Sequence, residues 1–147
     1  MSKILLLALC IGLFSSCNED ITKPEEHFEG EGLYLLNAKK DTVIYYFQGK
    51  VRSGDILRSI INTTSEDLDL YFLDADKKTL NPPYEEEDHS LDWVITDTSI
   101  VKFNFAAGKK YSINHTGKKV GSTTFELQLL HQGHPDFRTV LIPVEVK

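Results

Sequence analysis

The chain has 147 residues, and its 16 lysines and arginines are outnumbered by 22 aspartates and glutamates, which gives a formal net charge of −6. This acidic balance argues against a nucleic-acid-binding surface, which needs clustered positive charge, and against a polybasic attachment to anionic lipid. The length suits one domain that is stabilised by its apolar core.

The N-terminal residues have the pattern of a secretory signal peptide. Lys3 provides a short cationic start, Ile4–Phe14 is apolar, and Ser15 and Ser16 are small residues directly before Cys17. This order matches the charged region, apolar region and cleavage site of exported proteins. The apolar run is shorter than the about 20 residues that a membrane-spanning helix needs.

The segment Phe14–Cys17 resembles the lipobox of bacterial lipoproteins, with phenylalanine in the place of the usual leucine. The resemblance implies that residues 1–16 are removed and that Cys17 receives a diacylglycerol and an acylated amino terminus. Several acyl chains anchor a protein stably. We therefore expect a palmitoylated lipoprotein of the outer membrane, on its periplasmic or cell-surface side. An ordinary cleaved secretory signal is the alternative.

Residues 17–29 are rich in carboxylates and poor in apolar side chains, which predicts a solvated tether between membrane and domain. The start of this tether, Asn18–Asp20, resembles the acidic export signal of Bacteroidota-type surface lipoproteins. The alternative is a charged linker without a signal function. The folded domain is predicted over residues 30–147, with order beginning near Phe28.

Beyond the tether the sequence predicts only strands. Several segments alternate apolar and polar residues with period two, as in Phe125, Leu127 and Leu129, and turn-forming residues separate them. Nine segments are rich in β-branched or aromatic residues: Leu33–Leu36, Val43–Phe47, Ile56–Ile61, Leu68–Leu73, Leu91–Ile95, Ile100–Phe105, Tyr111–His115, Thr123–Leu130 and Val140–Val146. These patterns predict an all-β, antiparallel β-sandwich.

Part of the C-terminal half resembles immunoglobulin-like domains. Ser99–Tyr111 is similar to their E strand, E–F corner and F strand, and His115–Leu130 to the F–G hairpin and G strand of the bacterial members. The resemblance implies an immunoglobulin-like sandwich in which the Tyr111 hydroxyl bonds back to the corner. Pro143 lies in the last predicted strand and cannot donate a ladder hydrogen bond, so we expect that strand at a sheet edge.

His131, His134 and Asp136 form the candidate metal site. Imidazole nitrogens suit Zn²⁺ and Cu²⁺, and a carboxylate is a further ligand for zinc. His131 continues the inward phase of Phe125–Leu129, which places it at the rim of the sandwich. The alternative is an ordinary hairpin loop without a cofactor, because this segment also contains turn-forming residues.

The sequence lacks the GxSxG, HExxH, P-loop and GxGxxG motifs. The leading interpretation is therefore a non-enzymatic binding or adhesion module, or an accessory module of an envelope complex, whose partner is an envelope protein or a glycan. Binding residues concentrate on loops, which points to Tyr84 in the connection Asp74–Asp92 and to Asp136 and Phe137. A metal-binding lipoprotein is the alternative function.

Overall fold

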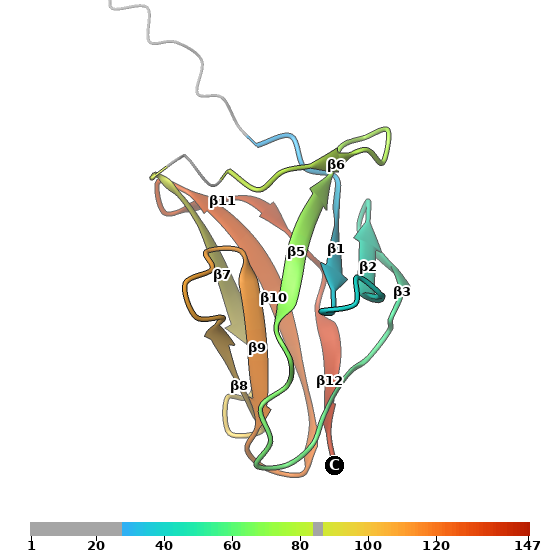
Figure 1. Ribbon diagram of the computed structural model, residues 1–147, viewed down its shortest axis with the longest axis vertical. Coiled ribbons are helices and arrows are strands. Elements are labelled where there is room, and N and C mark those ends of the chain that lie inside the picture. Colours follow the sequence, from blue (N-terminus) through green and yellow to red (C-terminus); the bar gives the residue numbers. More distant parts are fainter. Residues whose placement is uncertain (1–27, 84–86) are drawn as a thin grey trace, which may run out of the picture.

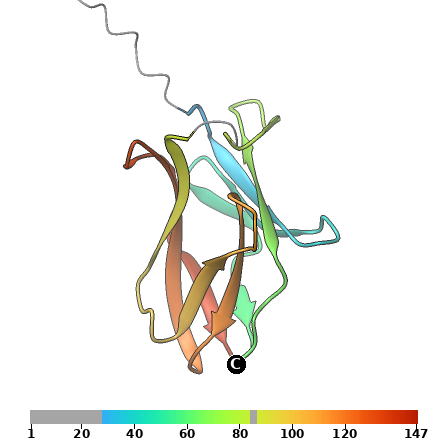
Figure 2. The ribbon, with the colours of Figure 1, turned by 60° about the vertical axis from the view of Figure 1, so that its left-hand side comes forward.

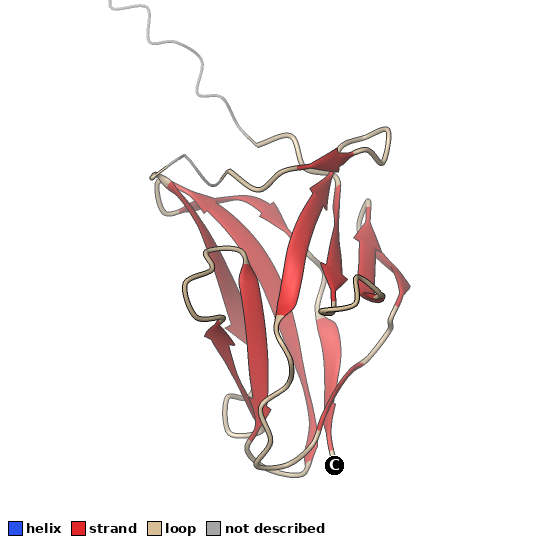
Figure 3. Ribbon diagram, in the orientation of Figure 1, coloured by secondary structure: helices blue, strands red, loops and turns tan. Residues whose placement is uncertain are grey.

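The computed structural model describes residues 28–83 and 87–147. In these two ranges every regular element is a strand, as Figure 3 shows. The described part of the chain accordingly contains no helix that is long and apolar enough to span a membrane. The all-β prediction is confirmed. The expectations for residues 1–16, for Cys17 and for Tyr84 fall outside the described residues.

The first sheet contains the N-terminal strands and one later hairpin. Its strand order is β3-β2-β1-β5-β9-β8, β6 pairs with β5, and all pairs are antiparallel. The strands are β1 (Gly32–Leu36), β2 (Thr42–Phe47), β3 (Lys50–Ser53), β5 (Leu68–Leu73), β6 (Thr79–Leu80), β8 (Val101–Phe105) and β9 (Ser112–Gly117).

The second sheet is built around the long strand β10. Strand β7 pairs with one side of β10, and β11 and β12 pair with the other side, all antiparallel, whereas β4 is parallel to β12. The strands are β4 (Leu57–Ser59), β7 (His89–Ile95), β10 (Gly121–His131), β11 (His134–Arg138) and β12 (Ile142–Val146). Figures 1 and 2 show the two sheets as facing layers.

The core lies between the sheets and follows the predicted alternation. Phe125, Leu127 and Leu129 are at most 1% exposed. Phe105, the last residue of β8, is 50% exposed, and its ring lies 4.7 Å from that of Trp93 in β7.

The sandwich class is confirmed, but the predicted strand correspondence is wrong. E and F strands lie in different sheets of an immunoglobulin domain and F pairs with G, whereas here β8 pairs with β9 and β10 lies in the other sheet. The Tyr111 hydroxyl donates to the carbonyl of Pro83 at 3.3 Å instead of to the corner.

The predicted edge position of the last strand is also wrong, because β12 lies between β10 and β4. Pro143 is nevertheless accommodated. The cross-strand partner of Pro143 is Thr124, whose carbonyl accepts a hydrogen bond from the N–H of Thr96 on the β7 side. The backbone of Pro143 therefore points its hydrogen-bonding side away from β10. Pairing with β4 begins only at Val144. The absence of a backbone N–H at Pro143 therefore costs no hydrogen bond between strands.

Candidate functional site

The segment that contains His131, His134 and Asp136 is a tight hairpin. Gln132 and Gly133 have φ of 50° and 84°, the left-handed pair of angles that characterises a two-residue type I′ turn. His131 and His134 are direct cross-strand partners on either side of this turn. The segment after the turn is strand β11 rather than an open loop.

A β-bulge directs Asp136 towards His131. Leu130 pairs with Pro135 and Leu129 pairs with Phe137, so Asp136 is the extra residue of β11, and a bulge of this kind changes the direction of the side chain that it carries. Its Oδ2 lies 3.5 Å from Nδ1 of His131 and accepts a hydrogen bond of 3.1 Å from the backbone N–H of Phe28.

Strand β7 and the turn that precedes it add two further side chains. His89 is the cross-strand partner of His131 on the other side of β10, and the two rings stack with centroids 4.4 Å apart and 5° between their planes. The carboxylate of Asp88 spans both rings, with Oδ1 3.1 Å from Nδ1 of His89 and Oδ2 3.0 Å from Nε2 of His131. We call Asp88, His89, His131 and Asp136 the histidine–aspartate cluster.

The cluster is buried on one side and open on the other. The side chains of His131 and Asp136 are 10% and 7% exposed, whereas that of Asp88 is 45% exposed. Partial desolvation would raise the pKa of Asp88, but hydrogen bonds with His89, His131 and Gln132 outweigh this effect and lower it. Asp88 therefore presents an ionised carboxylate.

The structure brings together only part of the predicted metal site. His131 and Asp136 meet, but His134 is exposed and lies outside the group Asp88, His89 and His131, whose ligand atoms are within 4.8 Å of one another. Phe137 was predicted as an exposed binding residue. That prediction is wrong, because Phe137 is 6% exposed and packs against Phe72 in the core, with ring centroids 5.4 Å apart.

A second candidate surface lies on the outer face of the first sheet. Tyr34 in β1 pairs with Tyr45 in β2 on one side and with Tyr71 in β5 on the other. Direct partners project from the same face of a sheet, and the neighbours Leu33 and Leu35 are fully buried, so these tyrosines face outward. All three are partly exposed, and the rings of Tyr34 and Tyr45 lie 4.7 Å apart. We call them the tyrosine row.

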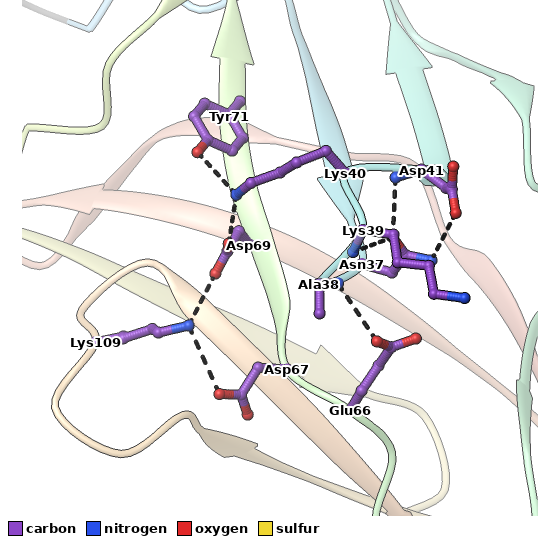
Figure 4. Close-up of polar contacts among 10 residues, drawn as sticks. All are labelled: Asn37, Ala38, Lys39, Lys40, Asp41, Glu66, Asp67, Asp69, Tyr71 and Lys109. Carbon is purple, nitrogen blue, oxygen red and sulfur yellow. Dashed lines mark hydrogen bonds and ion pairs between the residues drawn. The ribbon is translucent and has the colours of Figure 1, made fainter.

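Charged groups lie beside Tyr71 at one end of this row, as Figure 4 shows. Nζ of Lys40 lies 2.8 Å from Oδ2 of Asp69, donates to the Tyr71 hydroxyl at 3.3 Å and lies 5.2 Å from the Tyr71 ring centroid. Nζ of Lys109 lies 3.3 Å from Asp69 and 3.7 Å from Asp67. Partial burial would raise the pKa of Asp69, but the hydrogen bonds from Lys40 and Lys109 contribute to an opposite effect that outweighs it, so the pKa is lowered.

The turn between β1 and β2 positions Lys40. Oδ1 of Asn37 accepts hydrogen bonds from the backbone N–H groups of Lys39 at 3.0 Å and Asp41 at 2.8 Å. Such an Asn side chain replaces a backbone turn and holds Lys40 at a φ of 66°. This turn therefore places the Lys40 ammonium group beside the tyrosine row.

Comparison with known proteins identifies no family. No family model matches the chain, and no curated protein does. Among solved structures, the chain is similar to "Crystal structure of the S-layer protein SbsC domains 4 and 5", with a TM-score of 0.43 and 14% sequence identity. The match covers 61% of this chain and 46% of that chain, so this protein spans less than half of the structure it matches.

Proposed function

We propose that this protein is a lipid-anchored, extracytoplasmic binding module without catalytic activity, and that it binds a carbohydrate chain across the tyrosine row. The observation that carries the proposal is the alignment of Tyr45, Tyr34 and Tyr71 on three adjacent strands of an outward-facing sheet. The lipid anchor rests on the lipobox resemblance at Cys17.

The dimensions and chemistry of the row suit sugar rings. Adjacent strands are about 4.8 Å apart, so the row extends over about 10 Å, which is enough for two neighbouring sugar units. Aromatic faces pack against the C–H faces of a sugar, while the phenolic hydroxyls provide hydrogen-bonding groups at the ring edges. The contact between Tyr34 and Tyr45 makes these two rings one continuous surface.

The border of the row favours a neutral, hydroxyl-rich ligand over a strongly charged one. The Lys40 and Lys109 ammonium groups are donors, and the Asp67 and Asp69 carboxylates are acceptors. They are arranged in ion pairs that balance each other's charge. The side chains of Lys40 and Lys109 are 54% and 50% exposed, so they are accessible to a ligand that lies on the tyrosines.

A glycan array first identifies the sugars that bind the protein, and calorimetric titration with those sugars then tests the proposal. Tyr34→Ala and Tyr45→Ala are each expected to lower the affinity roughly fivefold or more, since an aromatic contact contributes about 1 kcal/mol. Phe105→Ala is the matched control, because Phe105 is an exposed aromatic on another strand, and it should bind as the unmodified protein does.

Circular dichroism establishes that each variant is folded. An array without any bound glycan argues against the proposal, and so does binding that survives both tyrosine substitutions. A protein partner captured through the same tyrosines would replace the carbohydrate as the ligand of this face.

A further inference from the structure

We propose that the histidine–aspartate cluster is a Zn²⁺ site in which Asp88, His89 and His131 are the ligands and Asp136 positions His131. The site is formed where β7 begins and β10 ends, at the upper left of Figure 1. It belongs to the second sheet and shares no residue with the tyrosine row, so it does not depend on the proposed carbohydrate binding.

The Asp88 carboxylate lies about as far from each imidazole as two ligand atoms of one zinc ion lie from each other. Ligand atoms bonded at about 2.0–2.1 Å to a tetrahedral ion lie about 3.3 Å from one another. The Asp88 carboxylate lies 3.0 Å from His131 Nε2 and 3.1 Å from His89 Nδ1. Because the β7–β10 ladder pairs His89 directly with His131, the backbone already holds the two imidazoles side by side.

Entry of the ion must turn the two rings apart. Each imidazole lone pair lies in the plane of its ring, and the planes of His89 and His131 are nearly parallel, so the lone pairs do not yet meet at one point. All three ligand atoms are within 4.8 Å of one another. We therefore expect side-chain rotation to complete the site, with loss of the stacked arrangement.

Asp136 has the place of a carboxylate that orients a metal-bound histidine. Metal-ligating histidines donate their second ring N–H to such a group, which leaves the other nitrogen free for the ion. Here Nδ1 of His131 faces Asp136 at 3.5 Å, while Nε2 faces Asp88. The bulge in β11 and the hydrogen bond from Phe28 keep the Asp136 carboxylate in this position.

The open side of the cluster gives the ion access. Asp88 is the most exposed of the ligands, with 45% of its side chain accessible, so solvent reaches its carboxylate. Three protein ligands and one water make an open zinc site. Two nitrogens and one carboxylate oxygen favour Zn²⁺ over Ca²⁺ and Mg²⁺, which prefer oxygen ligands.

Isothermal titration of the chelator-treated protein with ZnCl₂ tests the site. We expect one saturable site and a higher melting temperature in the presence of Zn²⁺, because the ion binds the folded state. Asp88→Asn and His131→Gln should abolish both effects. Asp136→Asn should weaken binding roughly tenfold while retaining it, as expected for a positioning residue.

His134→Gln is the matched control, since His134 is the other cross-strand partner of His131 but is exposed and outside the cluster. It should bind Zn²⁺ as the unmodified protein does. The Cys10→Ser, Cys17→Ser double variant should also bind, which excludes thiolate ligands. Ring resonances of His89 and His131, but not of His134, should shift with Zn²⁺.

Absence of saturable Zn²⁺ binding overturns the proposal, and so does unchanged binding in Asp88→Asn. Asp88 is a surface residue, so its substitution tests the site even where His131→Gln fails to fold. A loss in His134→Gln as large as in His131→Gln would assign the ion to the hairpin itself. None of these outcomes bears on the tyrosine row.

Discussion

His115 is a buried imidazole that no candidate site uses. It is 2% exposed, its Nδ1 has no hydrogen-bond partner among the described residues, and burial lowers its pKa to about 4. Since the unfolded chain binds this proton with a pKa of about 6.5, the unfolded state takes up more protons than the folded state between these two values. Stability is therefore lost as pH falls from about 6.5 to about 4.

The expected contribution of His115 is about 3 kcal/mol of unfolding free energy lost between pH 7 and pH 4. Urea unfolding at both values, for the unmodified protein and for His115→Leu, measures it. The variant should lose about 3 kcal/mol less over the same range, because the other titrating groups are unchanged. Equal losses in both proteins would show that His115 is not a buried neutral base.

Phe125 tests the core in the same way. It is fully buried and its ring lies 4.7 Å from that of Phe103, so Phe125→Ala should lower the free energy of unfolding by about 3–5 kcal/mol. Phe105→Ala, at a half-exposed aromatic, should cost less than about 1 kcal/mol. Chemical denaturation compares the two variants, and similar losses would place Phe105 in the core as well.

At the scale of single elements, the β10–β11 turn controls where His131 and Asp136 meet. Gly133 has a φ of 84° and no neighbour within 4 Å of an added Cβ, so a substitution there is limited by backbone strain alone. Gly133→Val should destabilise the protein by about 1–2 kcal/mol, while Gly133→Asn should cost much less because asparagine tolerates this conformation. Thermal unfolding separates the two, and equal effects would argue against the type I′ turn.

The sequence predicts strands better than it predicts their partners. All nine segments contain strands, because alternation of the kind seen in Thr123–Leu130 is a local property. Three of the described strands were missed, namely β3, β6 and β11. β11 was missed because His134–Arg138 contains a proline and little apolar character. The pairing of His89 with His131 was missed because it depends on the register between strands that are far apart in the chain. In addition, Asp88 and His89 end a run of acidic residues, which is typical of a loop. The row of Tyr34, Tyr45 and Tyr71 depends on register too.

For the whole molecule, the anchor at Cys17 remains a prediction. Cys17→Ser should block lipid attachment, so the protein should accumulate as an uncleaved precursor or leave the membrane fraction, and it should no longer incorporate labelled palmitate. Cys10→Ser, in the segment expected to be removed, is the control and should be lipidated normally. Label retained by Cys17→Ser would refute the lipoprotein assignment.

Protease treatment of intact cells then distinguishes the two faces of the outer membrane. Digestion of the domain would support export to the surface by the acidic start of the tether, Asn18–Asp20. Protection in cells with an intact envelope would place the domain on the periplasmic side.

The central claim is that the outer face of the first sheet binds carbohydrate. Amide chemical-shift mapping of the protein, titrated with a glycan that binds it, tests this claim most directly because it reports on every strand at once. We predict that the perturbed amides cluster in β1, β2 and β5 around Tyr34, Tyr45 and Tyr71, and that the amides of β7 and β10 remain unchanged. Perturbations confined to the second sheet or to the ends of the sandwich would contradict the account.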